Sequence, residues 1–408
     1  MRHPISSTAL LAVTAAGALI LSACGGGAAS GGDAGGGGGG DDKGPIKLGV
    51  LADLTGATGD VGTPYNEGMM AYIDWVNGNG GIEGRQIEAS SNDYAYKVPT
   101  AEELYKKYVS SGAVAIQGWG TGDSEALRTK VGADKLPFMS ASYAEVLTDP
   151  QKSPYNFVVA PTYSDQMRVA LNWIAKDAGA PAQVAVFHHD SPFGTAPVAD
   201  GQAWIKEKGL NLGYKAYAMP RTPNFVGLLS QAQAQKADYI VIQNVSSPAA
   251  QVAKDIQGQN LDMKIVCLNW CADELFVKTA TPAAAEGHIM VQPFAPPAVA
   301  KPGHQAISDY LQSKGGGTLE DKGLHYAQGW YTMHVMAQGM AKAIKDGNEL
   351  TGENIKAALE TMDAVDTGGV VGTGAVKFSA DSHRGSTGSG IYEVKGGKLT
   401  ELAANQVP

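Results

Sequence analysis

The chain reads Ile46-Lys-Leu-Gly-Val-Leu-Ala-Asp-Leu-Thr-Gly56 after a glycine-rich leader, and the apolar start of this stretch predicts a buried β-strand. Further on, Met69, Tyr72, Ile73 and Val76 recur at the spacing of one face of a helix. A cluster of glycines and asparagines then ends the predicted helix. Strand, loop and helix in this order form the repeating unit of a parallel α/β sheet.

The same alternation continues along the chain. Further strands are predicted at residues 86–93, 113–117, 137–142, 183–189, 239–244 and 264–270. Helices are predicted between them, and Thr100 with Glu103 has the pattern of a capping box that opens one of these helices. Because the chain has 408 residues, two α/β lobes are expected rather than one.

The last part of the chain is predicted to return to the first lobe. The proline-rich residues 291–297 cannot continue as a central strand, so they are interpreted as a crossover. Two helices at 322–346 and 352–362 follow, and a hairpin around Gly396 and Gly397 closes the chain. The predicted domains are a signal peptide at 1–23, a tether at 24–44, a first lobe at 45–160 plus 293–375, and a second lobe at 161–292 plus 376–408.

Composition excludes several classes of function. The 31 Lys and Arg against 40 Asp and Glu give a net charge of −9, without a basic run that could follow a phosphate backbone, so no nucleic-acid partner is expected. Three cysteines are too few for a disulfide scaffold, and they form no cluster with histidine at zinc spacing, so no metal site is predicted.

The N-terminus has the pattern of an export signal. A basic start precedes the apolar run 9–20, which is too short to span a bilayer. Leu21-Ser22-Ala23-Cys24 follows and resembles the bacterial lipobox, in which the cysteine receives a diacylglycerol and becomes the first mature residue. Twelve glycines between residues 25 and 44 then predict a flexible tether. We expect an exported protein anchored through Cys24 to the outer face of the bacterial cytoplasmic membrane, or in the periplasm; a secretory signal with a chance cysteine is the alternative.

Several short stretches in the body resemble one known family. These stretches are 46–56, 77–84 with Asp93, Gln117-Gly-Trp-Gly-Thr-Gly122, 138–148 and Phe187-His-His-Asp-Ser-Pro-Phe-Gly194. Over residues 46–400 the chain resembles the solute-binding lipoproteins of ABC importers, in the branch typified by the leucine/isoleucine/valine-binding protein. The resemblance implies two Rossmann-like lobes with parallel central sheets, a three-stranded hinge and a ligand cleft between the lobes. It also implies a permease as partner, a small-molecule ligand, no cofactor and no catalysis.

The resemblance places most candidate ligand-binding residues in loops that follow predicted strands. Trp119, Gly120 and Thr121 follow one strand, where free backbone amides suit a carboxylate, and Thr121 falls where the family has the hydroxyl that binds the ligand carboxylate. The other candidates are Ala141, Ser142, Tyr143, Phe193, Asn269 and Tyr326. Residues 141–143 match the place where the family offers a backbone carbonyl and a hydroxyl to the ligand. A one-residue gap in the match leaves open which of these residues corresponds to which group. Phe193 matches a ring that stacks on the ligand, and Tyr326 is placed at the rim.

One position departs from the family. The amino-acid binders hold the ammonium of the ligand with a carboxylate, and Asn269 stands at the matching position. A buried ammonium without a counter-charge costs several kcal/mol, which favours an amide, a urea-like compound or an aromatic carboxylate as ligand. Asp273 or Glu274 could supply the missing charge instead, and Trp119 and Trp270 either line the cleft or cover the sheet.

Other patterns have plainer interpretations. His188 and His189 are neighbours on a strand and point to opposite faces, so a structural or rim role is expected rather than metal binding. Cys267 and Cys271 are expected to form a local disulfide or two buried thiols rather than a redox pair. The chain has no Gly-x-Ser-x-Gly, His-Glu-x-x-His or P-loop motif, so a binding module is favoured over an exported enzyme. A ligand sensor of the same fold is a third possibility.

Overall fold

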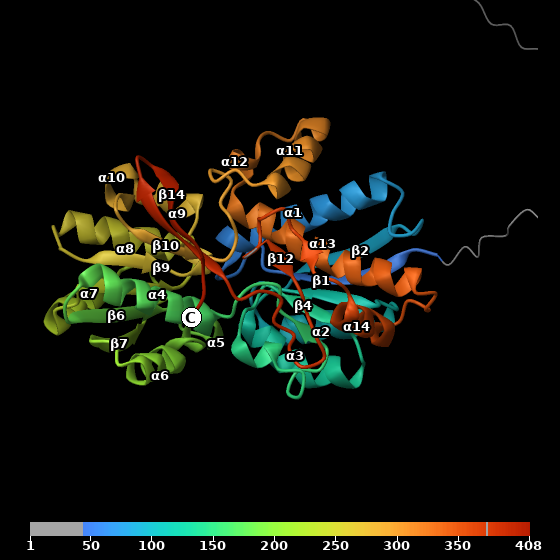
Figure 1. Ribbon diagram of the computed structural model, residues 1–408, viewed down its shortest axis with the longest axis horizontal. Coiled ribbons are helices and arrows are strands. Elements are labelled where there is room, and N and C mark those ends of the chain that lie inside the picture. The colour runs from blue at the N-terminus through green and yellow to red at the C-terminus, as the bar shows by residue number, and fades with distance from the viewer. Residues whose placement is uncertain (1–43, 373) are drawn as a thin grey trace, which may run out of the picture. The chain divides into compact units, whose positions relative to one another are not determined.

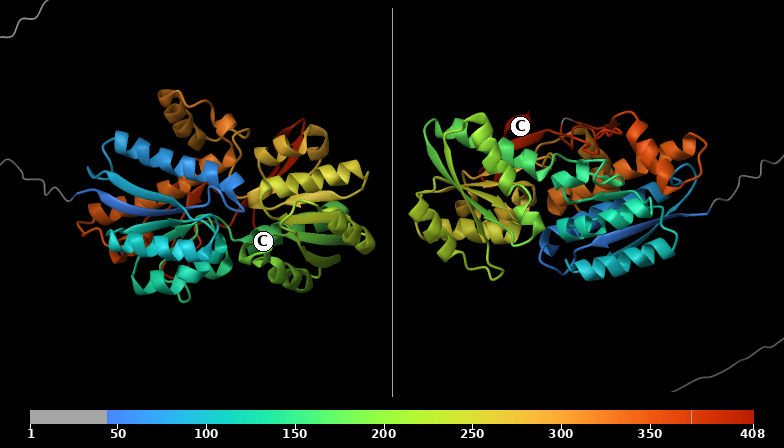
Figure 2. Two further views of the ribbon diagram at one scale, coloured as in Figure 1. Left: turned by 180° about the vertical axis from the view of Figure 1, so that it is seen from behind. Right: turned by 90° about the horizontal axis from the view of Figure 1, so that it is seen from below.

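A computed structural model describes residues 44–372 and 374–408, which fold into two α/β lobes that lie side by side (Figure 1, Figure 2). The predicted signal peptide, the lipid attachment at Cys24 and nearly all of the tether lie outside the described residues. Along the described parts of the chain, no helix combines the length and the apolarity needed to cross a bilayer.

The first lobe is built on a five-stranded parallel sheet of order β2-β1-β3-β4-β5. Its strands are β1 (Ile46–Ala52), β2 (Ile87–Asp93), β3 (Ala115–Gly118), β4 (Phe138–Ser140) and β5 (Asn156–Phe157). The intervening helices are α1 (Gly59–Gly78), α2 (Val98–Ser110), α3 (Thr121–Ala133) and a short 3₁₀ helix (Glu145–Thr148). The predicted strand–helix alternation of this lobe is confirmed.

The second lobe is built on a seven-stranded sheet of order β14-β13-β10-β9-β8-β6-β7. Strands β6 to β10 are parallel, whereas β13 and β14 add an antiparallel hairpin. The strands are β6 (Ala182–His188), β7 (Leu212–Ala218), β8 (Tyr239–Gln243), β9 (Lys264–Cys267), β10 (Ile289–Gln292), β13 (Ser389–Lys395) and β14 (Lys398–Gln406). The helices are α4 (Tyr163–Ala178), α5 (Pro192–Thr195), α6 (Val198–Lys208), α7 (Val226–Gln235), α8 (Ser246–Gly258), α9 (Glu274–Ala280) and α10 (Pro282–Ala285). The predicted hairpin around Gly396 and Gly397 is confirmed.

Three connections join the lobes, at 158–162, 293–301 and 377–388. The first and third run next to each other, because Val158 and Arg384 form a parallel bridge. Between the second and third connections lie α11 (Pro302–Lys314), α12 (Leu319–Lys322), α13 (Leu324–Lys345), α14 (Gly352–Thr361), β11 (Val365–Asp366) and β12 (Ala375–Val376). These elements belong to the core of the first lobe, and α13 packs along α1 (Figure 1).

Local details correct two expectations. Helix α2 begins at Val98, so Thr100 lies inside the helix and not at a capping box; Pro99, which is favoured in a first turn, starts the helix earlier. The strand predicted at 264–270 ends at Cys267, and a 3₁₀ helix (Asn269–Cys271) follows. Strand β7 and helices α6 and α7 are among the elements that were not predicted. Their patterns are weak because β7 is an edge strand and α6 buries only Gly201.

Candidate functional site

A small chamber of about 10 Å³ lies where the two lobes meet. Its walls come from loops that follow strands or begin helices at one edge of each sheet, the place where open parallel sheets bind ligands. The first lobe contributes Thr58, Tyr96, Trp119, Gly120, Thr121 and Ala141, and the second contributes Tyr163, Phe193, Val245 and Trp270. None of these lining residues carries a formal charge near neutral pH.

Thr121 forms the polar end of the chamber. It is the first residue of α3, and its Oγ1 lies 2.8 Å from Ser142 Oγ. The first amides of a helix have no carbonyl partner within the helix, and together with the helix dipole they favour an anion. This end of the chamber therefore suits a carboxylate or a carbonyl oxygen.

Two tryptophans, one from each lobe, meet across the chamber. The ring centroids of Trp119 and Trp270 are 4.8 Å apart in an edge-to-face arrangement. Trp119 Nε1 donates to Thr58 Oγ1 at 2.8 Å, and Trp270 Nε1 donates to Tyr163 Oη at 3.0 Å. Because both indole N–H groups already have partners within the protein, the tryptophans offer a ligand mainly their apolar rings.

Trp270 is held by further rings behind the chamber. It stacks on Tyr143, with centroids 5.7 Å apart, and on His325 at 5.1 Å. Tyr65 meets its edge at 6.0 Å. Since Tyr65, Tyr143 and His325 belong to the first lobe and Trp270 to the second, this stack is a contact between lobes.

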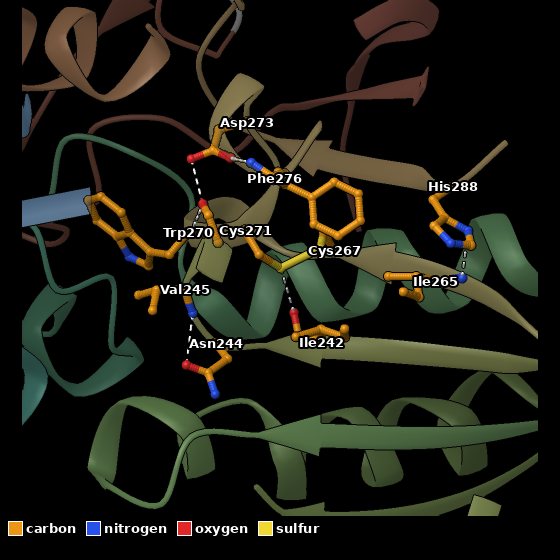
Figure 3. Close-up of a disulfide and its surroundings, with 12 residues drawn as sticks. Ile242, Asn244, Val245, Ile265, Cys267, Trp270, Cys271, Asp273, Phe276 and His288 are labelled. Atoms are coloured by element: carbon orange, nitrogen blue, oxygen red, sulfur yellow. Dashed lines mark hydrogen bonds between the residues drawn. A yellow bond between two sulfur atoms is a disulfide. The ribbon is translucent and has the colours of Figure 1, made fainter. Parts of the chain in front are cut away.

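A disulfide fixes the turn that carries Trp270. Cys267 at the end of β9 and Cys271 are bonded, with Cα atoms 5.4 Å apart, and both are fully buried. Figure 3 shows Trp270 pointing away from the two sulfur atoms. The local disulfide, one of the two plainer interpretations of these cysteines, is present, and it orients the chamber wall.

The candidate residues from the sequence fall into two groups. Trp119, Gly120, Thr121, Ala141 and Phe193 line the chamber. Four other candidates lie outside the lining: Ser142, Tyr143, Asn269 and Tyr326. Ser142 contacts Thr121, and Tyr143 stacks behind Trp270. Tyr326 is buried on α13. Their roles toward a ligand stay predictions.

Four lining residues were missed by the sequence analysis: Thr58, Tyr96, Tyr163 and Val245. Thr58, Tyr96 and Val245 follow strands β1, β2 and β8, so the carboxyl ends of strands were the available signal. Trp270, whose position was left open, lines the chamber.

Asn269 is buried behind the chamber wall. Its Oδ1 accepts from Gln328 Nε2 at 2.8 Å and its backbone N–H donates to Gln166 Oε1 at 3.2 Å, whereas Nδ2 has no partner within residues 44–372 and 374–408. That Asn269 marks the ammonium position of the family stays a prediction.

The two acids that could replace a missing counter-charge are engaged elsewhere. Asp273 accepts from Ser246 Oγ at 2.6 Å and from the Phe276 N–H at 2.7 Å, and it pairs with His325. Glu274 accepts from the Leu324 N–H at 3.1 Å, and burial raises the pKa of its carboxyl to about 7. Neither residue lines the chamber.

A larger groove of about 770 Å³ shares Tyr96 with the chamber and is also lined by both lobes. Its walls include Lys97, Arg221 and Lys254, none of which has an acidic partner within salt-bridge distance among the described residues. The acids in the same walls are Asp190 and Asp123, and burial raises the pKa of Asp123 to about 7. The groove therefore has an excess of positive charge at neutral pH although the chain is acidic.

The described residues show no metal centre. No three His, Cys, Asp or Glu side chains in residues 44–372 and 374–408 lie together as metal ligands. His188 Nδ1 is 3.0 Å from the carbonyl oxygen of His189, and His189 Nδ1 is 2.7 Å from Ser191 Oγ. His189 lines the groove, which agrees with the rim role expected from the sequence.

Solved structures share this fold over most of their length. A branched-chain amino acid ABC transporter protein from Thermus thermophilus with bound valine is 24% identical, with a TM-score of 0.84 over 90% of this chain and 97% of that one. An ABC transporter substrate-binding protein from Aeropyrum pernix is 26% identical, with a TM-score of 0.80 over the same shares. A fatty acid ABC transporter substrate-binding protein from Thermomonospora curvata is 20% identical, with a TM-score of 0.78 over 90% and 92%.

A search of curated proteins found no match to this chain. A family model described as periplasmic binding protein matches residues 45–398, which include all ten residues that line the chamber. The chain therefore belongs to the periplasmic binding protein family.

Proposed function

We propose that the protein is an extracytoplasmic solute-binding lipoprotein of an ABC importer. It captures a small polar solute by closing its lobes and delivers the solute to a membrane permease. The observation that carries this proposal is the chamber between the lobes, to which both lobes contribute uncharged side chains. The relatives named above support it, since their descriptions connect them with ABC transporters. Capture and release need no catalytic residue, and we propose no enzymatic activity.

The chamber favours a ligand without an ammonium group. The lining has no carboxylate, and a desolvated cation without a counter-charge costs several kcal/mol. Thr121 and the start of α3 suit a carboxylate or an amide carbonyl, and the two tryptophans suit an apolar or aromatic body. The cations of the outer groove would attract anions toward the cleft. Small carboxylates, aromatic carboxylates and amides are therefore placed ahead of branched-chain amino acids.

A thermal-shift screen of small metabolites against the full chain tests the proposal. A ligand that binds only the folded state raises stability by RT ln(1 + [L]/Kd), which is about 2.7 kcal/mol at a hundred times Kd. We expect saturable stabilisation by at least one small carboxylate or amide. A chain that turns a screened compound over, with no stable complex, would contradict the binding role.

Replacing Thr121 with valine should weaken ligand binding by about 1 to 3 kcal/mol. Valine keeps the shape of the side chain but removes the hydroxyl that lies 2.8 Å from Ser142 Oγ. Calorimetry with the best compound of the screen measures the change. Thr361→Val, on the exposed end of α14, is the matched control and should bind like the unmodified chain. Unchanged affinity of Thr121→Val would remove Thr121 from the site.

Lipidation is expected at Cys24, with residues 1–23 removed. The short apolar run, the lipobox-like Leu21-Ser22-Ala23 and the glycine-rich tether occur in the order that this processing requires. Mass spectrometry of the membrane-extracted protein should find a diacylglycerol-modified Cys24 at the N-terminus. An intact N-terminus, or cleavage at another bond, would contradict the assignment.

A further inference from the structure

Four polar contacts tie α13 and α1 of the first lobe to the second lobe, outside the chamber. His325 Nε2 lies 2.6 Å from Asp273 Oδ2, and the Leu324 N–H donates to Glu274 Oε2 at 3.1 Å. Gln328 Nε2 donates to Asn269 Oδ1 at 2.8 Å, and the Ser247 N–H donates to Asp60 Oδ2 at 3.0 Å. All four contacts join one group of the protein to another.

The contacts bury charge between the lobes. Only 4% of the side chain of His325 and 2% of that of Asp273 are exposed. Glu274 has one carboxylate oxygen, Oε1, that is buried without a partner in the part of the chain that the structure describes. Both ring nitrogens of His325 face acceptors, because Nδ1 bonds to Gln328 Oε1 and Nε2 to Asp273 Oδ2. A histidine that donates from both nitrogens carries both protons and is positively charged.

We propose that closure of the two lobes takes up protons through a latch formed by Asp60, Asp273, Glu274 and His325. This inference rests on the lobe closure of the proposed function. Opening the lobes would separate His325 from Asp273 and Glu274 from Leu324, and water would then solvate all four side chains. The closed state holds protons that the open state releases.

The groups that face His325 act in one direction. Asp273 and Glu274 come from the start of α9, and Asp60 comes from α1. Burial raises the pKa of Glu274 to about 7 and raises that of Asp60 above its ordinary value. Burial opposes the charge of His325, but the hydrogen bond and the charge of Asp273 outweigh this, so the pKa of His325 is raised.

The sign of the pH effect follows from these directions. The stabilisation that His325 gives to the closed state is complete below the ordinary pKa of histidine, about 6.5, and is lost as pH rises through its raised value. Glu274 is neutral in the closed state at low pH, and the closed state loses this advantage as pH rises from about 4.5 toward about 7. Asp60 acts in the same sense. Acidification should therefore favour closure.

The latch also touches the chamber. His325 stacks on Trp270, a lining residue, with ring centroids 5.1 Å apart. When His325 leaves Asp273, the support of Trp270 on this side is lost. His325 is thus a positioning residue for the chamber wall as well as part of the latch.

Hydrogen exchange of the full chain, with no compound added, tests the latch at pH 5.5 and pH 8. After correction for the intrinsic pH dependence of exchange, peptides that contain Leu324 and Asn269 should be about tenfold better protected at pH 5.5. In Glu274→Gln the side chain stays neutral at both pH values and keeps an oxygen for the Leu324 N–H. Its protection at pH 8 should rise toward the level at pH 5.5.

His334→Gln is the matched control. His334 lies on the same helix α13, bonds to Tyr72 of the first lobe at 3.0 Å, and has a pKa that burial lowers to about 4. This variant should keep the pH profile of the unmodified chain. Equal protection at the two pH values, or an unchanged pH dependence in Glu274→Gln, would overturn the latch. A chain that shows the pH effect but binds nothing in the metabolite screen would support the latch and contradict the proposed function.

Discussion

Gly329→Ala should lower the free energy of unfolding by about 1 to 3 kcal/mol. Helices α1 and α13 touch backbone to backbone at two glycines: a Cβ at Gly329 would overlap the carbonyl oxygen of Tyr65, and a Cβ at Gly68 would overlap that of Tyr326. An added methyl group must push the helices apart, and the rings that pack between them would lose contact. Chemical denaturation followed by circular dichroism measures the loss.

Gly227→Ala is the control for this substitution. Gly227 lies in helix α7, and a Cβ there meets no atom within 4 Å. Because alanine favours a helix over glycine by up to about 1 kcal/mol, this variant should be as stable as the unmodified chain or more so. If Gly329→Ala were equally stable, the close packing of α1 on α13 would not be needed for the fold.

The parts of the fold that the sequence predicted are those with local patterns. Strand β8 is buried at every position, and its residues 239–242 form a continuous apolar run, as expected of a central parallel strand. By contrast, edge strand β7 is half exposed, and α6 buries one glycine, so neither leaves a strong period in the sequence. The periodicity of apolar residues is strong where an element is buried, and elements at the margin of the second lobe bury few residues.

The candidate site was predictable only where a loop follows a recognised strand. The loop 118–122 was identified in this way. Tyr163 could not be identified from the sequence, because its place in the chamber depends on how the first connection between the lobes brings α4 against Trp270, which lies in a distant turn. The sequence did not show whether Asn269 or Trp270 lines the chamber. The disulfide and the 3₁₀ helix decide which of these two side chains reaches it. The places of Tyr163 and Trp270 in the chamber therefore depend on contacts between residues far apart in the sequence.

Benzoate should bind at least about 100-fold more tightly than leucine or valine. We expect the aromatic ring of benzoate to pack against the rings of Trp119 and Trp270, and its carboxylate to bind at Thr121 at the start of α3. A free amino acid would bring an ammonium into a lining without a carboxylate. The penalty of several kcal/mol for such a cation corresponds to at least two powers of ten in Kd.

The nearby acids do not remove this penalty in the structure. Asp273 is occupied by Ser246, Phe276 and His325. Glu274 accepts from Leu324, and its raised pKa leaves it partly neutral near pH 7. Recruiting either carboxylate for a ligand would break a contact between the lobes, which would offset the gain from a new ion pair.

Isothermal titration calorimetry of the full chain with benzoate, acetamide, leucine and valine shows directly whether the chamber excludes ligands with an ammonium group. We expect saturable binding of benzoate or acetamide, and binding of leucine and valine that is at least about 100-fold weaker. Sub-micromolar binding of leucine by the unmodified chain, with no binding of benzoate or acetamide, would contradict this expectation.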